Sequence, residues 1–247
     1  MFVPRKNQWN TNDGFLTEMH THVRGGSGCA MVDALDTLKA YKEYGYTTVV
    51  ITNHYGPWGE ATTGLKYAEY IDRLKELWQY AKDEGEKVGI YVLYGIELSF
   101  EAHDGDYLVY GFDWEFLYQN LNIYKELTIK EFYKIANENG FLVYQAHPFR
   151  DRGVPYCTDN CLDGLEVYNG HPGNDSRNEL AYNLAREKNM LMVSGSDFHG
   201  WGGECRGGII TKQPIVTIDD LMSTLRAQDY DILVDADLVN KINGQIE

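Results

Sequence analysis

The chain has little positive charge. Its 247 residues include 22 Lys plus Arg against 37 Asp plus Glu, so the formal net charge is −15. A surface this acidic repels the phosphate backbone of nucleic acids, although a local cationic pocket is compatible with the composition. We therefore expect no nucleic-acid polymer among the partners of this protein.

Long apolar runs are missing as well. The first residues contain no apolar segment of roughly 7–15 residues that would indicate a signal peptide, and no run approaches the roughly 20 apolar residues of a membrane-spanning helix. The four cysteines are too few for a disulfide scaffold in a chain of this length: Cys29, Cys157, Cys161 and Cys205. We expect a cytoplasmic protein with reduced thiols and no membrane contact.

Apolar runs of strand length alternate with amphipathic helical segments along the chain. The predicted strands are Phe15–His22, Thr47–His54, Val88–Phe100, Tyr107–Phe112, Phe141–His147, Gly164–Tyr168, Met190–Asp197 and Ile209–Thr211. This alternation predicts an α/β fold with a parallel sheet, either open or closed into a barrel, in one domain over residues 1–247. The third and fourth strands are separated by a short polar loop, so a hairpin is an alternative for that pair.

Polar side chains gather at the carboxyl-terminal ends of five of these apolar strands. They are His20, His22, His54, Glu97, His147, Asp197 and His199. Ligand sites of barrels and open α/β sheets form at this edge. Side chains two residues apart on a strand share a face, so His20 and His22 should project together.

Imidazole and carboxylate groups are ligands of zinc, iron and manganese. One His-x-His arises easily by chance, and a single strand-end histidine is often structural. A whole set at one end of several apolar strands is not explained by packing, because buried polar groups cost free energy unless they are paired or liganded. Seven such groups exceed the needs of one tetrahedral ion, which predicts a multinuclear site with the Glu97 carboxylate as the bridge.

The segments EMHTH, VVITNH, YGIE, QAHPF and GSDFH, in this order, resemble the polymerase and histidinol phosphatase (PHP) family over nearly the whole chain. The resemblance implies a distorted (β/α)7 barrel with two to three divalent ions (Zn, Fe or Mn) at its mouth. For the first ion it implies the ligands His20, His22, Glu97 and Asp197, of which the two carboxylates are also catalytic. It implies that Glu97 and His147 hold a second ion, and that His54 and His199 hold a third.

Two departures from the family pattern concern the second and third ions. Many members carry an Asp or His shortly after the His-x-His, where this chain reads VRGGSGCA. Cys29 is a candidate replacement as a metal ligand, or simply a small residue before the next helix. Members often place a histidine on the strand after the glutamate. Here the segment EAHDGDYLVYG offers His103 or Asp106, or neither of them.

The resemblance implies a metal-dependent phosphoesterase that hydrolyses a small phosphorylated substrate with a metal-activated water. Arg150 and Arg206 follow two of the motifs and are candidates for phosphate binding, because a guanidinium binds two phosphate oxygens at once. Each is equally open to a surface ion pair. His171 is a candidate for substrate contact or general acid catalysis.

Two other functions remain open. A metal-dependent amidohydrolase also carries His-x-His on its first strand, but Glu97 in place of a bridging lysine and His199 after Asp197 favour the phosphoesterase. A non-catalytic metal-binding module is the second alternative. The sequence does not indicate the substrate, the metal or the oligomeric state.

Overall fold

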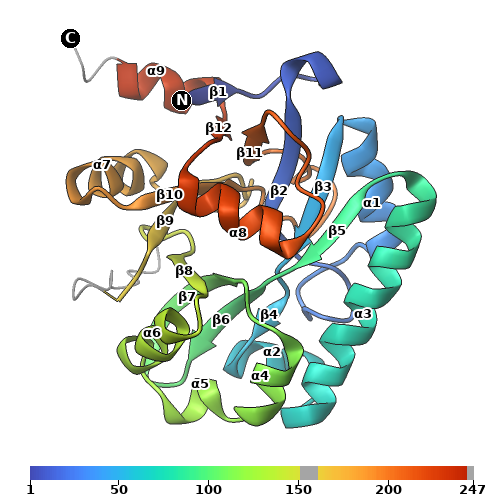
Figure 1. The fold of residues 1–247 in the computed structure, drawn as a ribbon, viewed down its shortest axis with the longest axis vertical. Coiled ribbons are helices and arrows are strands. Elements are labelled where there is room, and N and C mark those ends of the chain that lie inside the picture. The colour runs from blue at the N-terminus through green and yellow to red at the C-terminus, as the bar shows by residue number, and fades with distance from the viewer. Residues whose placement is uncertain (151–160, 244–247) are drawn as a thin grey trace.

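The computed structural model describes residues 1–150 and 161–243 of the chain, which contain two six-stranded sheets (Figure 1). The first sheet consists, in spatial order, of β1 (Phe2–Pro4), β12 (Asp231–Val234), β11 (Gly208–Thr211), β2 (Phe15–Thr21), β3 (Tyr46–Ile51) and β5 (Tyr91–Tyr94). The second consists of β10 (Leu191–Gly195), β9 (Gly164–Asn169), β8 (Leu142–Gln145), β7 (His103–Tyr110), β6 (Ile96–Phe100) and β4 (His54–Tyr55).

Helices connect most of these strands. They are α1 (Ala34–Glu43), α2 (Pro57–Thr63), α3 (Tyr67–Val88), α4 (Trp114–Gln119), α5 (Ile123–Glu126), α6 (Ile129–Glu138), α7 (Asn178–Lys188), α8 (Ile218–Ala227) and α9 (Ala236–Asn243), with one 3₁₀ turn, η1 (Thr11–Asp13). Helices α1 and α3 lie side by side along one flank of the molecule, and α4 to α6 gather around the lower part of the second sheet (Figure 1). The predicted α/β class is confirmed.

Most strand pairs are parallel. β2, β3 and β5 run parallel in the first sheet, as do β8, β9 and β10 in the second. β6 and β7 form the hairpin that was the alternative reading of the sequence, with Ile96 opposite Val109. The connection that forms this hairpin is short, as antiparallel neighbours allow.

The predicted (β/α)7 barrel is not confirmed. Neither of the two sheets closes on itself through hydrogen-bonded strands within residues 1–150 and 161–243. A parallel bridge joins the two sheets between Thr21, at the end of β2, and Phe198, beyond β10.

An apolar core fills the space between the sheets. Strands of both sheets contribute to it, with Met19, Val50 and Val193 among the fully buried side chains. Helix α8, which crosses in front of the strands in Figure 1, adds Leu221 and Leu225 to the same cluster. Each of the three strand residues precedes a predicted metal ligand on its own chain segment. The polar site therefore lies beyond the carboxyl-terminal side of this core, where parallel α/β folds place their sites.

The remaining expectations concern membranes and thiols. No helix in the described part of the chain combines the length and the apolar character that crossing a membrane requires. Cys29 and Cys205 are free thiols, but Cys161 is disulfide-bonded, so the expectation of reduced thiols is wrong for Cys161. Cys157 lies outside the described residues.

Candidate metal centre

The structure brings the seven predicted ligands together from five chain segments. His20 and His22 come from the end of β2, His54 from β4 and Glu97 from β6. His147 follows β8, and Asp197 and His199 follow β10. His20 and His22 are completely buried, and Glu97 and Asp197 are each 1% exposed. Donor atoms of these seven residues and of Asp106 form three groups of three residues, and the donor atoms within each group lie within 4.8 Å of one another.

The first group consists of His20, His22 and Asp197, and Glu97 completes a cage of four side chains around it. The Nε2 atoms of His20 and His22 are 3.1 Å apart, which confirms that the two rings project together. Each Nε2 is 3.4 Å from Oδ1 of Asp197 and 3.3 Å from a carboxylate oxygen of Glu97. Ligands about 2.1 Å from one ion are separated by roughly 3.0–3.4 Å, so these distances fit a single bound cation.

Hydrogen bonds fix the tautomer of His20. Its Nδ1 lies 2.9 Å from Oε1 of Glu166, a buried residue of β9. A carboxylate accepts hydrogen bonds, so Nδ1 carries the proton and Nε2 presents a lone pair to the cage. This carboxylate–imidazole arrangement is the one that orients histidine ligands in metal sites.

A second network fixes the tautomer of His22. Its Nδ1 lies 2.9 Å from the hydroxyl of Ser27. That hydroxyl donates to Oδ1 of Asn53, which also accepts from the backbone N–H of Val23. The Ser27 oxygen therefore accepts the Nδ1–H of His22, and the Nε2 lone pair faces that of His20. Two lone pairs 3.1 Å apart repel unless a proton or a metal ion lies between them, so these residues fit a metal ion.

The second group consists of Glu97, Asp106 and His147. Nε2 of His147 is 3.0 Å from Oε1 of Glu97 and 4.0 Å from Oδ2 of Asp106. Burial raises the pKa of Asp106, and the Glu97 carboxylate raises it further. Of the two residues that the sequence offered for this position, Asp106 belongs to the group. The side chain of His103 is outside the described part of the structure.

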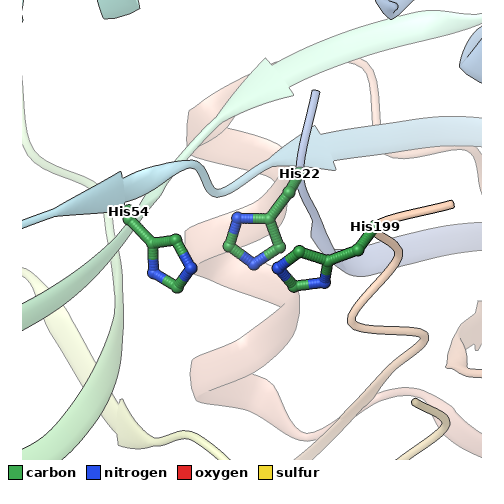
Figure 2. Close-up of side chains that lie close together, drawn as sticks. All are labelled: His22, His54 and His199. Carbon is green, nitrogen blue, oxygen red and sulfur yellow. The ribbon is translucent and has the colours of Figure 1, made fainter. Parts of the chain in front are cut away.

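The third group consists of His22, His54 and His199, whose rings turn toward one another (Figure 2). The ring centroid of His22 is 4.5 Å from that of His54 and 4.2 Å from that of His199. Nδ1 of His199 donates to the carbonyl oxygen of Asp197 at 2.9 Å, which leaves its Nε2 free to bind an ion. The neighbouring His199 and His54 outweigh burial and lower the pKa of the Cys29 thiol to about 6.

Two buried atoms between the groups lack hydrogen-bond partners. Nδ1 of His54 and Oε2 of Glu97 lie 2.8 Å apart without forming a hydrogen bond. Unsatisfied buried polar atoms cost free energy and are rare in folded proteins. A cation held by both atoms would satisfy them, and it would make Glu97 the bridge between ion positions.

Electrostatics at the centre favour the ligand forms of Glu97, Asp197 and His22. At His20, His54 and His199, neighbouring acidic groups outweigh burial and raise the pKa, so a bound cation would take the place of a proton there. Burial alone would raise the pKa of Glu97, but His54 and His20 outweigh it and hold that pKa well below its usual value. Asp197 behaves in the same way, through His20 and His22. Burial and the neighbouring His199 and His54 lower the pKa of His22 to about 4. Neutral imidazole and ionised carboxylates are the forms that bind metal.

The backbone around the last motif differs from the prediction. Strand β10 ends at Gly195, so Asp197 and His199 do not lie on a strand as the sequence suggested. Asp197 adopts φ +50° and His147 adopts φ +30°, both uncommon for residues other than glycine. The turn is anchored on β2, where the N–H of His22 donates to the carbonyl of Phe198 at 3.0 Å. This turn directs Asp197 and His199 into the centre, whereas the sequence suggested that the alternation of side chains along a strand would do so.

The predicted substrate-binding residues flank the centre. Arg150 forms an ion pair with Asp197 and donates to Oδ1 of Asn169 at 3.2 Å. Arg206 and His171 line a neighbouring polar cavity of about 260 Å³. The buried Nε atoms of both arginines have no hydrogen-bond partner. The His171 ring centroid is 5.5 Å from that of His199.

Three residues that position ligands were not predicted from the sequence. Glu166 holds His20, while Ser27 and Asn53 hold His22. The sequence did indicate that Glu166 has a partner, because it is the only charged residue in the apolar segment GLEVYN, where an unpaired charge would be costly. Ser27 and Asn53 gave no such indication, because small polar residues are common in loops and at the ends of strands.

The fold and the site together define an α/β protein with a buried histidine–carboxylate centre at its strand ends, suited to divalent metal ions. No family model and no curated protein matches the sequence, but solved structures do. A two-domain protein from Bacteroides vulgatus containing a predicted PHP-like metal-dependent phosphoesterase matches with a TM-score of 0.65 and 17% identity, over 94% of this chain and 70% of that one. PsfC from Pseudomonas syringae matches with 0.64 and 16%, over 94% and 97%. The resemblance to the PHP family is thus confirmed for the fold.

A further structural match corrects one expectation. The lesion-specific endonuclease EndoQ from Pyrococcus furiosus matches with a TM-score of 0.60 and 15% identity, over 88% of this chain and 57% of that one. A protein with this fold therefore acts as a nuclease. The prediction that excluded a nucleic-acid polymer is wrong, because net charge does not decide what one local site accepts.

Proposed function

We propose that residues 1–247 form one PHP-like domain that acts as a metal-dependent phosphoesterase with two to three divalent ions (Zn, Fe or Mn). One observation carries the proposal: the Nε2 lone pairs of His20 and His22 converge at 3.1 Å beside the buried carboxylates of Glu97 and Asp197. The similar solved structures include a predicted metal-dependent phosphoesterase and an endonuclease, both of which support hydrolysis of a phosphate ester.

When bound, the ions supply an activated water and a positive field for the phosphoryl oxygens. The chain's own part is to hold its ligands in fixed positions. His20, His22, Glu97 and Asp197 would hold the first ion. Glu97, His147 and Asp106 would hold the second, and His54 and His199 belong to the third. Glu97 and Asp197 are catalytic in the sense that they face the reacting centre directly.

The two arginines suit the recognition of phosphate. Arg150 stays close to the centre because Asp197 and Asn169 bind one end of its guanidinium group. Its buried Nε–H has no hydrogen-bond partner, and a phosphate oxygen that reached it would satisfy this group. Arg206 presents a second unpaired Nε–H beside the cavity lined by His171. Guanidinium groups bind phosphate with charge-assisted hydrogen bonds, so both residues would orient the substrate.

The surroundings of His171 favour substrate contact over general acid catalysis. Its Nδ1 accepts the backbone N–H of Gly173 and lies 3.1 Å from the amide nitrogen of Asn174. Burial also lowers the pKa of His171. The ring is therefore neutral at pH 7, with its proton on Nε2. We assign this Nε2–H the role of donating a hydrogen bond to the substrate.

An ester-hydrolysis assay tests the proposal. Protein loaded with zinc, manganese or iron should release aryl alcohol from an aryl phosphate mono- or diester, and Asp197→Asn should lower this rate at least about 100-fold because the first ion loses a ligand charge. Asp36→Asn, an exposed change on α1, should leave the rate unchanged. A panel of amide substrates separates this activity from that of an amidohydrolase. Absence of ester hydrolysis with all three metals would overturn the proposal.

A further inference from the structure

The polar cavity of about 260 Å³ lies at the same edge of the fold as the metal centre. Its walls are the end of β9 with the loop that follows, the first residues of α7, the first residues of α9, and Arg206. Helices α7 and α9 are neighbours (Figure 1). Strand β12, which precedes α9, is antiparallel to β11, and β11 is antiparallel to β2. β12 and β2 therefore end at the same edge, where β2 presents its two histidines.

Two contacts connect this cavity to the metal centre. The ring centroid of His171, a wall residue, lies 5.5 Å from that of His199. Asn169, another wall residue, accepts a hydrogen bond from Arg150 at 3.2 Å, and the same guanidinium nitrogen pairs with Asp197. A substrate with its phosphate at the metal centre would therefore extend its esterified group toward this cavity.

The wall next to the centre is held in place by Asn169. Its Oδ1 also accepts the backbone N–H of His171 and the hydroxyl of the buried Ser176, each at 3.2 Å. Its backbone N–H donates to Oδ1 of Asn178, the first residue of α7, at 2.9 Å. The loop between β9 and α7 is thus folded around one side chain. A wall that is ordered before binding lowers the entropic cost of fixing a ligand.

Arg206 forms the border between the cavity and the last metal-ligand motif. Its backbone N–H donates to the hydroxyl of Ser196 at 2.8 Å. Its side chain lies against Gly170, where an added Cβ would be only 2.6 Å from Cβ of Arg206. The buried Nε–H has no hydrogen-bond partner. An unsatisfied buried donor costs free energy, and an oxygen atom of a ligand would satisfy it.

The chemistry of the walls decides which kind of group they suit. Among the described residues that line the cavity, four are carboxylates and three are cations, and one such pair, Lys241 and Glu179, is 3.8 Å apart. Nearly balanced charge favours neither a second phosphate nor a cationic group. The apolar lining residues are Pro172 and Leu238, while Tyr168 is only 2% exposed. These walls therefore offer little surface for stacking a planar aromatic ring.

Asp235 shows how such a wall can bind a hydroxyl group. Its Oδ1 accepts the backbone N–H of Leu238 at 2.8 Å, and its Oδ2 accepts the hydroxyl of Tyr168 at 3.3 Å. The carboxylate is thereby fixed, and each oxygen has a second lone pair for a ligand donor. A hydroxyl group both donates and accepts, so it suits a wall that carries carboxylates and cations side by side.

We propose that this cavity binds a polyhydroxylated group, so that the substrate is a phosphate ester of a sugar or polyol. The volume lies just below the range of about 300–1,000 Å³ that is typical of ligand sites, which fits a group of monosaccharide size. His171 and Arg206 lie between the reacting phosphate and the hydroxyl groups. This inference rests on the proposed phosphoesterase function.

A panel of matched phosphate esters tests the inference on the wild-type protein. Glucose 6-phosphate, ribose 5-phosphate and hexyl phosphate are compared by release of inorganic phosphate from the metal-loaded protein. Hexyl phosphate has the carbon content of the glucose ester but no hydroxyl groups. We expect kcat/KM to be at least about 100-fold higher for the better sugar phosphate, because a site built for hydroxyl groups rejects an analogue that lacks them. Phenyl phosphate and adenosine monophosphate represent esters with planar rings.

A carboxylate-to-amide change connects this preference to the cavity. Asp235→Asn keeps an acceptor for the N–H of Leu238 but replaces an acceptor by a donor, so KM for the sugar phosphate should rise about 10-fold. Its kcat, and both constants for phenyl phosphate, should stay unchanged. Asp229→Asn is the matched control, because this exposed carboxylate pairs with Lys212 at 3.0 Å outside the cavity.

The outcomes separate the inference from the function on which it rests. Equal kcat/KM for hexyl phosphate and the sugar phosphates, or a preference for the planar esters, would overturn the inference and leave the phosphoesterase standing. A sugar preference that Asp235→Asn does not change would overturn the assignment of the hydroxyl groups to this cavity. No phosphate release from any ester of the panel would overturn both proposals.

Discussion

The carboxylate of Glu166 orients metal ligands of two different ion positions. Oε1 of Glu166 accepts from Nδ1 of His20, and Oε2 accepts from the backbone N–H of His147 at 2.8 Å and from the side-chain amide of Asn169 at 3.0 Å. Both oxygens of Glu166 accept hydrogen bonds. A glutamine at this position would therefore place its amide N–H against one of the groups that donate to Glu166. Glu166 therefore sets both the ring orientation of His20 and the backbone position of His147.

We expect Glu166→Gln to lower zinc affinity about 10–100-fold, the usual effect of removing a residue that orients a metal ligand. Competition with a chromophoric chelator measures the affinity. Glu43→Gln, an exposed change on α1, is the matched control and should bind zinc as the wild type does. Unchanged affinity in Glu166→Gln would show that the imidazole of His20 keeps its orientation without the carboxylate.

We expect the stability of the protein to depend on pH because of Glu18. This fully buried residue of β2 has its pKa raised from 4.5 to about 7 because burial disfavours the charge. The folded state thus binds the proton more tightly than the unfolded state does. Below about pH 4.5 the side chain is protonated in both states and does not destabilise the fold. As the pH rises from there through 7, the free energy of unfolding falls, because the unfolded state releases the proton first.

Glu18→Gln removes this titration. The amide oxygen can keep the backbone hydrogen bonds that Oε1 accepts from His20 and Ser196, although the Ser196 hydroxyl loses its acceptor at every pH. Between pH 5 and pH 8 the stability of the variant relative to the wild type should rise by about 2–3 kcal/mol. Urea unfolding of both apoproteins measures this difference. Parallel pH profiles would contradict a raised pKa for Glu18.

At the residue scale, the predictable part of the centre was the ligands themselves. His20 and His22 could be predicted because polar rings at the end of a buried apolar strand cost free energy unless they are paired or bound to a ligand. Asp106 remained one of two options, because the spacing within EAHDGDYL does not reveal the register of β6 against β7. The ion pair between Arg150 and Asp197 was not predictable either, because it joins residues 47 positions apart.

At the scale of elements, Gly195 controls how closely β10 approaches β2. A Cβ at this position would lie 2.3 Å from Cβ of His20 and 2.9 Å from Oε1 of Glu166. Neither neighbour can move without disturbing the first ion position. The last residue of β10 is therefore restricted to glycine by packing, not by an unusual backbone angle.

Gly195→Ala should lower the free energy of unfolding by about 1–3 kcal/mol, the usual cost of overpacking, and weaken zinc binding because His20 must shift. Gly200→Ala is the control from the same segment, since its Cβ would meet only the flexible end of the exposed Met31. That variant should stay within about 0.5 kcal/mol of the wild type. Chemical denaturation and zinc competition measure both effects. Equal stability of the two variants would show that β10 can move away from β2.

Element boundaries were less predictable than element types. The apolar run Val88–Phe100 was expected to be one strand, but Val88 ends α3, and Gly89 follows it with φ +75°. The rest divides at Gly95 into β5 of one sheet and β6 of the other. The predicted strand Thr47–His54 divides in the same way into β3 and β4. Apolar periodicity cannot show such divisions, because both pieces are buried and extended.

At the scale of the whole molecule, net charge was a poor guide to partners. The value of −15 averages over the whole surface, whereas a ligand experiences the local field at the site. Arg150 pairs with Asp197 of the metal centre, Arg206 lines the neighbouring cavity, and the Nε atoms of both lack hydrogen-bond partners. Cations in a confined site can attract an anionic substrate despite an acidic exterior. The fold class was predictable from the alternation of elements, but barrel closure was not, because it depends on hydrogen bonds between strands distant in sequence.

Metal binding should be linked to the stability of the entire chain. The centre joins strands of both sheets through buried ligands such as His20 and Glu97, and an unfolded chain cannot present them together. Metal at 100 times its Kd should therefore stabilise the fold by about 2.7 kcal/mol. For a protein of this size that corresponds to a rise in Tm of roughly 5–10 °C. Differential scanning calorimetry of chelator-treated protein, with and without added zinc, measures the shift. Asp197→Asn should show a smaller shift, and Asp36→Asn the full one. Identical Tm values for the wild type with and without zinc would contradict a metal site shared by the two sheets.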